Sequence, residues 1–465
     1  MIWLRCHGTI LLFMLACASA RGEATTIWNV RDHGAAGDGS SLDTAAIQKA
    51  IDACAEAGGG TVLLSAGRYL SGTITLKSHV ALEIGSGATL LGSQKREDYP
   101  MVDDGWGDGK KTIAPLIWAD GAENITITGR GTIDGQGEIW WRAILERARR
   151  ARAATEAAGG STPLAAASRP TTGPTTRLQG EAALGRPQLV RLVHCKDVVI
   201  EHVTCINSPA WNLHPLFCER VRVDGVTITA PVPSPNTDGI NPESCKNVQI
   251  TNCRIDVGDD CITLKSGINE LGRKMGRPDE DITISNCVMY KGHGGVSIGS
   301  EMSGGVRNVT IMNCVFHGTD NGIRIKSQRG RGGVVEGVAV SNVVMHDVQH
   351  PFTITTFYQG SDRGETHEVG EGTPRFRNFL FSNITARGAR DAGSITGLAE
   401  MPVENVIFDN VQLQAQRGFS AAHAKQVIFR DVVIDNAEGP PLSQRDCTDL
   451  DVSRLRFPTT QTVSE

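Results

Sequence analysis

The chain has 465 residues, of which 53 are glycine and only 5% are aromatic, and its formal net charge is −5. The mild acidity argues against a nucleic-acid partner, because proteins that bind nucleic acid present a basic surface. No run of about 20 apolar residues occurs, so no transmembrane helix is expected.

The first 20 residues predict a signal peptide. Arg5 precedes an apolar segment, and Ala18-Ser19-Ala20 fits an A-x-A cleavage site. We therefore expect a secreted or periplasmic protein. Residues 14–17 also resemble a bacterial lipoprotein site, so the alternative is a lipid anchor through Cys17. Either way, the ten remaining cysteines would meet an oxidising compartment in which they could pair.

Residues 43–57 predict the clearest helix of the chain. Asp43 or Thr44 would be its N-cap, and three consecutive glycines from Gly58 would end it. If the chain continues as a stack of strands, the first turn of that stack would expose unpaired strand edges unless something covers it. We expect this helix to be that cap.

Residues 142–186 differ in composition from both of their neighbours. The first half is rich in Ala and Arg and could form a helix, whereas the second half is rich in Gly, Ser, Thr and Pro and is expected to be a flexible loop. The segment reads as an insertion, and we recognise no chemistry in it.

From Lys196 onward a short pattern repeats, in which a charged residue is followed by a stretch that alternates apolar and polar side chains. Repeats of 20 to 50 residues indicate a solenoid, a propeller or an array. The period of two excludes helical repeats. The sequence therefore predicts an all-β fold, a single parallel β-helix over residues 25–460 with an N-terminal capping helix. The clearest repeats begin at Lys196, Glu219, Lys246, Glu280, Arg307 and Glu336.

Two ladders of identical residues follow from this alignment. Asparagine tolerates the left-handed turn conformation, and its side chain can bond the backbone of the next turn of the chain. Buried cysteine behaves as a small apolar residue, so we favour a core ladder over disulfides or metal binding. The asparagines are Asn252, Asn286, Asn313, Asn342 and Asn383, and the cysteines are Cys253, Cys287 and Cys314.

A second short strand begins fifteen residues after four of the repeat starts, and charged residues gather before or within it. Neighbouring strands of a parallel sheet lie about 4.8 Å apart. Residues far apart in sequence are therefore expected to meet in one stacked patch. The residues concerned are Asp238, Asp259, Asp260, His293, Arg324 and Lys326.

Three carboxylates on adjacent turns suggest catalysis. Like charges resist joint ionisation, so one carboxyl can stay protonated as an acid while another stays ionised as a base. Carboxyls on adjacent turns could lie about 6.5–9.5 Å apart, as in inverting glycosidases. Arg324 and Lys326 offer donors suited to a sugar that carries a carboxylate. Lys265 has the same column position as Lys326, and it either extends this basic stripe or is a solvated structural lysine.

Four short motifs occur in the order Asn236-Thr237-Asp238, Gly258-Asp259-Asp260, Gly292-His293-Gly294 and Arg324-Ile325-Lys326. Together they resemble the signature of the polygalacturonases, glycoside hydrolase family 28. The resemblance extends from about Trp28 to beyond Asn410. It implies a right-handed parallel β-helix that hydrolyses α-1,4-galacturonan by inversion, without a metal or other cofactor.

The resemblance also implies roles for the residues of the catalytic motifs. Asp259 would be the general acid, and Asp238 and Asp260 would hold and activate the water. His293 would support the acid. In many fungal members the cysteine that corresponds to Cys261 pairs with a cysteine just before the Gly-His-Gly motif. Here Tyr290 and Lys291 occupy that second place, so no such bridge is expected.

Substrate binding is implied for a second set of residues. Arg324 and Lys326 would bind the galacturonate carboxylate, and Asn236 is grouped with them. Tyr358 resembles a tyrosine of the family that contacts substrate, although it could equally be a surface aromatic at the edge of the groove. The expected partner is an acidic polysaccharide, and we expect a monomer.

Other functions stay open at this stage. The insertion and the sequence after His293 resemble bacterial members that cleave from chain ends, so end-wise cleavage is a hypothesis. A rhamnogalacturonan or other substituted-pectin hydrolase, a calcium-dependent pectate lyase and a non-catalytic polysaccharide-binding β-helix are the alternatives.

Overall fold

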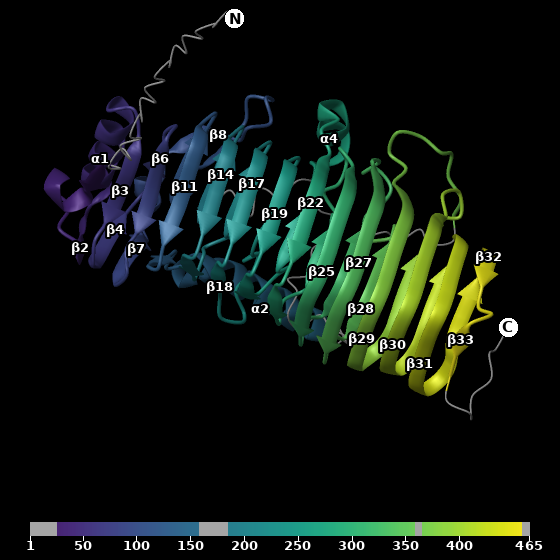
Figure 1. Ribbon diagram of the computed structural model, residues 1–465. Coiled ribbons are helices and arrows are strands. Elements are labelled where there is room, and N and C mark those ends of the chain that lie inside the picture. The colour runs from purple at the N-terminus through teal and green to yellow at the C-terminus, as the bar shows by residue number, and fades with distance from the viewer. Residues whose placement is uncertain (1–25, 158–184, 359–364, 458–465) are drawn as a thin grey trace, which may run out of the picture.

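The computed structural model describes residues 26–157, 185–358 and 365–457. Over these ranges the chain forms a parallel β-helix, in which each turn contributes strands that pair in parallel with those of the turn before (Figure 1). The predicted fold class is confirmed. The predicted signal peptide and Cys17 lie outside the described residues.

The first row of strands contains the repeats that the sequence predicts. All six repeat starts are in register, because Lys196 pairs with Glu219, Glu219 with Lys246, and so on through Glu336. The row consists of β1 (Ile27–Asn29), β3 (Gly60–Leu64), β6 (Val80–Ile84), β11 (Glu123–Gly129), β14 (Lys196–Glu201), β17 (Glu219–Asp224), β19 (Lys246–Thr251), β22 (Asp279–Ser285), β25 (Val306–His317), β27 (Val334–His346), β29 (Arg375–Thr396), β30 (Val403–Ala422), β31 (Ala424–Arg445) and β32 (Thr448–Asp451).

The second row of strands lies beside the first, and its strands also pair from turn to turn. The long strands from β25 onward run through both rows. It consists of β2 (Asp38–Leu42), β4 (Gly67–Ser71), β7 (Ala88–Gly92), β12 (Thr132–Asp134), β15 (Thr204–Ile206), β18 (Thr227–Thr229), β20 (Arg254–Asp256), β23 (Val288–Tyr290) and, at the C-terminal end, β33 (Leu455–Arg456).

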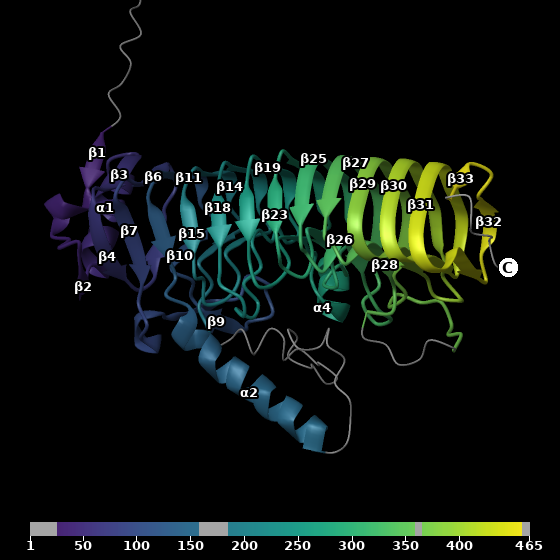
Figure 2. The same ribbon diagram turned by 90° about the horizontal axis from the view of Figure 1, so that it is seen from below.

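The third row faces the side of the molecule from which α2 and α4 project (Figure 2). Between β16 and β21 it continues through single-residue bridges at Ile240 and Glu243. It consists of β5 (Ile74–Thr75), β10 (Ile117–Asp120), β13 (Val190–Val193), β16 (Leu213–Leu216), β21 (Ile262–Leu264), β24 (Val296–Ile298), β26 (Asn321–Lys326) and β28 (His350–Thr355).

Helix α1 (Thr44–Glu56) lies at the N-terminal end of the stack, where the capping helix was expected (Figure 1). Its apolar residues recur at helical spacing, and Ile47, Ile51 and Cys54 are fully buried. Asp43 occupies the N-cap position but makes no side-chain bond to the helix. Its carboxylate instead accepts hydrogen bonds from the backbone N–H groups of Ala36 and Gly37, at 2.7 and 3.0 Å.

Helix α2 (Glu138–Ala157) begins the insertion, which confirms that its first half is helical. The remaining elements are α4 (Asn269–Met275), the 3-10 helices η1 (Val30–His33) and η2 (Arg96–Asp98), and the antiparallel pair β8 (Met101–Asp103) and β9 (Lys111–Ile113). The expected flexible loop lies largely outside the described residues, but its last residue, Arg186, does not.

The asparagine ladder adopts the predicted left-handed turn conformation. All five members have φ between 54° and 58°. Their partners differ from the expectation, because the bonds run to side chains rather than to the backbone of the next turn. Asn342 Nδ2 donates to Asn313 Oδ1 at 3.2 Å, and Asn410 Nδ2 donates to Asn383 Oδ1 at 2.8 Å. Stacked identical turns place these amides opposite one another.

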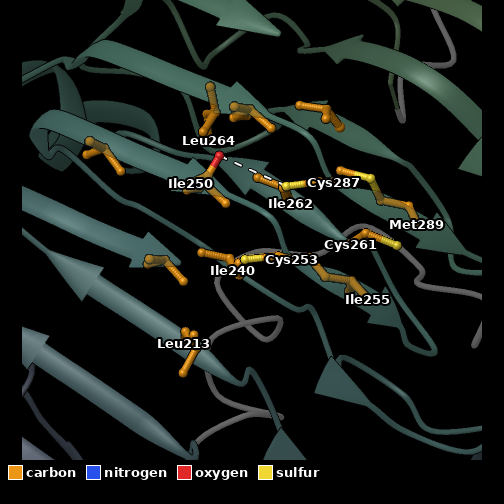
Figure 3. Close-up of a cluster of buried hydrophobic side chains, with 14 of the residues drawn as sticks. Leu213, Ile240, Ile250, Cys253, Ile255, Cys261, Ile262, Leu264, Cys287 and Met289 are labelled. Carbon is orange, nitrogen blue, oxygen red and sulfur yellow. Dashed lines mark hydrogen bonds between the residues drawn. The ribbon is translucent and has the colours of Figure 1, made fainter. Parts of the chain in front are cut away.

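The cysteine ladder lies in the core, as predicted. Cys253 and Cys287 lie among apolar side chains such as Ile240 and Ile262 (Figure 3). Each ladder thiol donates to a carbonyl oxygen two residues earlier at 3.2 Å, for example Cys253 to Thr251. All cysteines of the described ranges are free, and Cys261 is among them.

Candidate active site

The charged residues of the predicted patch lie at the start of the third-row strands or within them. Ile240 pairs with Ile262, and Asp238 and Asp260 each lie two residues earlier on consecutive turns. The N–H of Gly239 donates to the carbonyl oxygen of Asp260 at 3.0 Å. Ile240, Ile262 and Leu264 point into the core (Figure 3), so Lys265, which alternates with them, faces outward, whereas Asp238 and Asp260 belong to the turns that precede the strand positions.

Asp260 is held as a carboxylate. It is 2% exposed, and its Oδ2 accepts a 2.7 Å hydrogen bond from Lys326 Nζ. Arg324 lies 3.5 Å from Oδ1. Burial alone would raise the pKa of Asp260, but the charge of Lys326, followed by that of Arg324, outweighs it and holds the pKa far below its usual range.

The pKa of Asp238 is shifted in the opposite direction to that of Asp260. It is 4% exposed, and the nearest cation, Lys265 Nζ, is 3.8 Å from Oδ2. Burial, followed by the charge of Asp259, raises the pKa of Asp238 well above its usual range. Because the charge of Asp259 disfavours a second charge beside it, the protonated form of Asp238 is favoured.

Asp259 is more exposed than Asp238 and Asp260, and its turn is bonded to the turn that carries His293. The N–H of His293 donates to the carbonyl oxygen of Asp259 at 3.2 Å. The imidazole Nδ1 of His293 lies 2.7 Å from Oδ2 of Asp320. Burial opposes the imidazolium form, but the bond to Asp320 and the charges of Asp259 and Asp260 outweigh it and raise the pKa of His293.

The two glycines that flank His293 are required by the close packing of this turn. A Cβ at Gly292, where φ is +76°, would lie 2.5 Å from the carbonyl oxygen of Asp259. A Cβ at Gly294 would lie 2.3 Å from Ser297 Oγ and 2.7 Å from Asp260 Oδ1. The Gly-His-Gly sequence therefore lets the histidine turn pass directly beside the aspartate turn.

Arg324, Lys326 and Tyr358 lie together on the next turns. The guanidinium carbon of Arg324 is 5.3 Å from the centroid of the Tyr358 ring, and Lys326 Nζ is 5.1 Å from it. Tyr358 is held there by its N–H, which donates to the carbonyl oxygen of Ser327 at 2.9 Å. The cations face the aromatic ring on one side and Asp260 on the other.

Asn236 lies beside the patch, and its side chain is engaged by Arg186, which the sequence reading missed. The buried Arg186 donates to Asn236 Oδ1 at 2.9 Å and to the carbonyl oxygens of Pro209 and Pro235 at 2.8 Å each. Arg186 is the last residue of the segment 142–186, in which the sequence analysis recognised no chemistry. A single arginine after an irregular segment gave no sequence signal of this contact.

Three further side chains join the patch without belonging to any motif. Lys265 is buried, so it is neither a solvated lysine nor part of an exposed basic stripe. Its Nζ lies 3.2 Å from Oε2 of Glu301 and 4.6 Å from the centroid of the Trp211 ring. Sequence reasoning could align Lys265 with Lys326 but could not assign its partner, because Glu301 follows a turn.

Comparison with known proteins assigns the chain to a family. The profile described as "Glycosyl hydrolases family 28" matches residues 176–430, and one described as "Rhamnogalacturonase A/epimerase, pectate lyase-like" matches residues 27–142. The chain belongs to glycoside hydrolase family 28, the polygalacturonase family. It is therefore a glycoside hydrolase of the polygalacturonase type.

Several relatives resemble this family 28 hydrolase over most of its length. A "Probable polygalacturonase" of Vitis vinifera is 32% identical over 85% of this chain and 75% of its own. An "Endo-polygalacturonase" of Pectobacterium carotovorum subsp. carotovorum is 33% identical over 80% and 85%, respectively. The crystal structure of an exopolygalacturonase from Thermotoga maritima shares 30% identity, covers 87% of this chain and 92% of its own, and has a TM-score of 0.70.

The described ranges contain neither a membrane-spanning helix nor a metal-binding cluster. No helix there is both long and apolar enough to cross a bilayer. The same ranges hold no cluster of three or more His, Cys, Asp or Glu side chains arranged to bind a metal ion.

Proposed function

We propose that this family 28 hydrolase cleaves the α-1,4-galacturonosidic bonds of galacturonan by inversion. Asp259 is the general acid, and Asp238 and Asp260 hold and activate the attacking water. The observation that carries the proposal is the contrast between neighbouring carboxyls, since Asp260 is held ionised by Lys326 and Arg324 while burial and the charge of Asp259 raise the pKa of Asp238.

The reaction needs one acid and one base on opposite sides of the scissile bond. As the bond between C1 and the glycosidic oxygen breaks, the acid gives its proton to that oxygen. The base takes a proton from water as the water oxygen bonds to C1 from the other face. Asp259 is the most exposed of the three carboxyls and is therefore the one able to reach the glycosidic oxygen, while Asp260, held ionised, is the one able to take the proton from water.

The role of His293 follows from its position. Its Nδ1 is engaged by Asp320, which orients the ring, and its raised pKa favours the imidazolium. A positive charge beside Asp259 stabilises the carboxylate that forms once the acid has given up its proton.

A carboxylate-bearing sugar suits the cations of the patch. Arg324 is more exposed than Lys326 and has the planar fork that binds carboxylates, while Tyr358 supplies a ring beside it. The names of the relatives, all polygalacturonases, support the same substrate. Secretion, through the N-terminal signal peptide, is part of the proposal because the polymer is extracellular. End-wise cleavage remains a hypothesis, and the relatives include both endo- and exo-acting enzymes.

The test is hydrolysis of polygalacturonate followed by proton NMR of the anomeric signals and by sizing of the products. We expect the β-anomer to form first, and Asp259→Asn to lower kcat by at least about 100-fold. Asp435→Asn is the matched control, because Asp435 is exposed on β31, away from the patch. It should keep the activity of the parent protein.

The same experiment separates the alternatives. Unsaturated products whose formation stops when a chelator is added would show that the reaction is a lyase reaction and not hydrolysis. Undiminished turnover by Asp259→Asn would overturn the role of that residue. Oligomers of mixed length at early times would contradict end-wise cleavage while leaving the hydrolase proposal intact.

A further inference from the structure

Lys265 is a buried cation that the proposed reaction does not yet use. It follows β21 and is 5% exposed. Its Nζ lies 3.8 Å from Asp238 Oδ2 and 3.2 Å from Glu301 Oε2, and it is 4.6 Å from the centroid of the Trp211 ring. Because Lys265 is enclosed on these sides, we do not expect it to bind substrate itself.

Lys265 and Lys326 are related by the register of the third row. Leu264 pairs with Ile298 and Ile298 with Ile325, so the lysine that follows Leu264 and the lysine that follows Ile325 share one position in the stack. Each lysine lies near a different carboxyl, and the two distances differ. Lys326 contacts Asp260 at 2.7 Å, whereas Lys265 stays 3.8 Å from Asp238.

Glu301 explains the longer distance. It is the nearer of the two carboxylates to Lys265 Nζ, at 3.2 Å against 3.8 Å for Asp238. Loss of solvent opposes its ionisation, but the charges of Lys265, Arg331 and Lys326 outweigh this and lower the pKa of Glu301 to about 2. Glu301 is therefore a permanent anion that competes with Asp238 for Lys265.

We propose that Lys265 and Glu301 are positioning residues of the reaction, and that Glu301 keeps the Lys265 ammonium from closing onto Asp238. A lysine in full contact would hold Asp238 as a carboxylate, as Lys326 holds Asp260. The inference rests on the proposed function, in which Asp238 holds the attacking water beside the general acid Asp259.

Other charged groups face this network, and all of them remain in place in the test below. Asp238 is also influenced by Asp259, Asp260 and Lys326, and it acts in turn on Arg186. The groups that act on Lys265 are Glu301, Asp238, Glu243 and Asp260, and Lys265 itself acts on His214.

The test compares two variants whose effects should have opposite signs. In Glu301→Gln, Lys265 is free to move to Asp238, so the bell-shaped pH profile of kcat/KM on polygalacturonate should move to lower pH. In Lys265→Met, Asp238 loses the cation beside it, so the profile should move to higher pH. We expect each shift to be about one pH unit. A merely structural role would lower kcat without moving the profile, or would move it in one direction only.

Matched controls come from an ion pair on the outer surface. Lys246 Nζ lies 3.0 Å from Glu280 Oε1, so Lys246→Met and Glu280→Gln make the same chemical changes away from the patch. Both controls should keep the parent profile. If Lys265→Met fails to fold, Glu301→Gln alone still tests the sign.

A measurement without substrate separates this inference from the proposed function. Carbon-13 NMR on protein labelled at the aspartate side chains follows the Asp238 carboxyl directly, and Asp238→Asn assigns its signal. The midpoint should fall in Glu301→Gln and rise in Lys265→Met. Midpoints that do not move, or that move together, would overturn the inference. A parent protein that leaves galacturonan intact while these midpoints shift as expected would instead overturn the proposed function.

Discussion

At the scale of single residues, the guanidinium of Arg186 ties together two consecutive turns of the chain. Its three acceptors are the carbonyl oxygens of Pro209 and Pro235 and the side chain of Asn236. The last two lie within three residues of Asp238. Burial lowers the pKa of Arg186 to about 10, although the charges of Asp238 and Asp259 act against this. The side chain is still charged at neutral pH, so it holds the loop and adds positive charge behind the carboxyls.

We expect Arg186→Met to destabilise the protein by about 3 kcal/mol, because it leaves three acceptors in a buried site without their donor. Activity should fall at least 10-fold even where the variant is folded, since the loop that carries Asp238 loses its anchor. Denaturant unfolding and kcat at low temperature measure the two effects. Arg186→Lys should recover only part of either, because an ammonium cannot reach all three acceptors as the planar fork does. Wild-type activity in Arg186→Met would show that the anchor is unnecessary.

At the scale of elements, the repeat starts form a ladder in which the sign of the charge alternates. Glu123, Lys196 and Glu219 are followed by residues of alternating sign as far as Lys425. Members of the ladder form ion pairs, for example Arg377 with Glu336 at 2.7 Å. Exposed pairs of this kind contribute little stability each. A strand displaced by one turn would nevertheless face a like charge, so the ladder helps to specify the register.

The core of the C-terminal turns depends on a different ladder, made of stacked phenylalanine rings. Phe381, Phe408 and Phe429 are in register, with ring centroids 5.0 and 5.1 Å apart along the stack. Phe408 is fully buried and also meets Phe352 and Phe419 edge-on.

We expect Phe408→Ala to destabilise these turns by about 3–5 kcal/mol, through lost burial and the cavity left behind. Because each turn of a solenoid contacts only its neighbours, the turns from β29 to β31 should open first. Hydrogen exchange would show this as lost protection confined to those strands, with kcat/KM unchanged at low temperature. Phe408→Leu should lose less than half as much stability. Uniform loss of protection along the whole chain would mean that the β-helix unfolds as one unit.

At the scale of the whole molecule, the sequence was sufficient to predict the features that recur from one turn of the β-helix to the next. The strand register, the inward cysteines and the stacking of Asp238 with Asp260 all follow from counting residues within equivalent turns. Contacts that depend on the path of irregular segments could not be counted in this way. Asp320, Glu301 and Arg186 each reach the patch from a loop or an irregular segment, and the bonds of the asparagine ladder depend on amide orientation, which no spacing encodes.

The charged patch also makes the stability of the molecule depend on pH. Glu301 has a pKa lowered from its ordinary 4.5 to about 2 in the folded protein, and the pKa of Asp260 is lowered as well. A group with a lowered folded pKa contributes stability above its unfolded pKa, and that contribution is lost as the pH falls through the folded value. Asp238, whose pKa is raised, acts in the opposite direction, since its contribution is lost as the pH rises.

We therefore expect Glu301→Gln to lower the unfolding free energy of the protein above the acid range and to leave it nearly unchanged within that range. Each pKa unit corresponds to about 1.4 kcal/mol, so ionisation of Glu301 is worth about 3 kcal/mol at pH 6 and little at pH 2. The difference in unfolding free energy between parent and variant should shrink by that amount as the pH falls from about 4.5 towards 2. Denaturant unfolding at a series of pH values measures it, and Glu438→Gln, at an exposed position of β31, is the control. A difference that stays constant over this range would mean that Glu301 is not an anion stabilised by Lys265 and its neighbours.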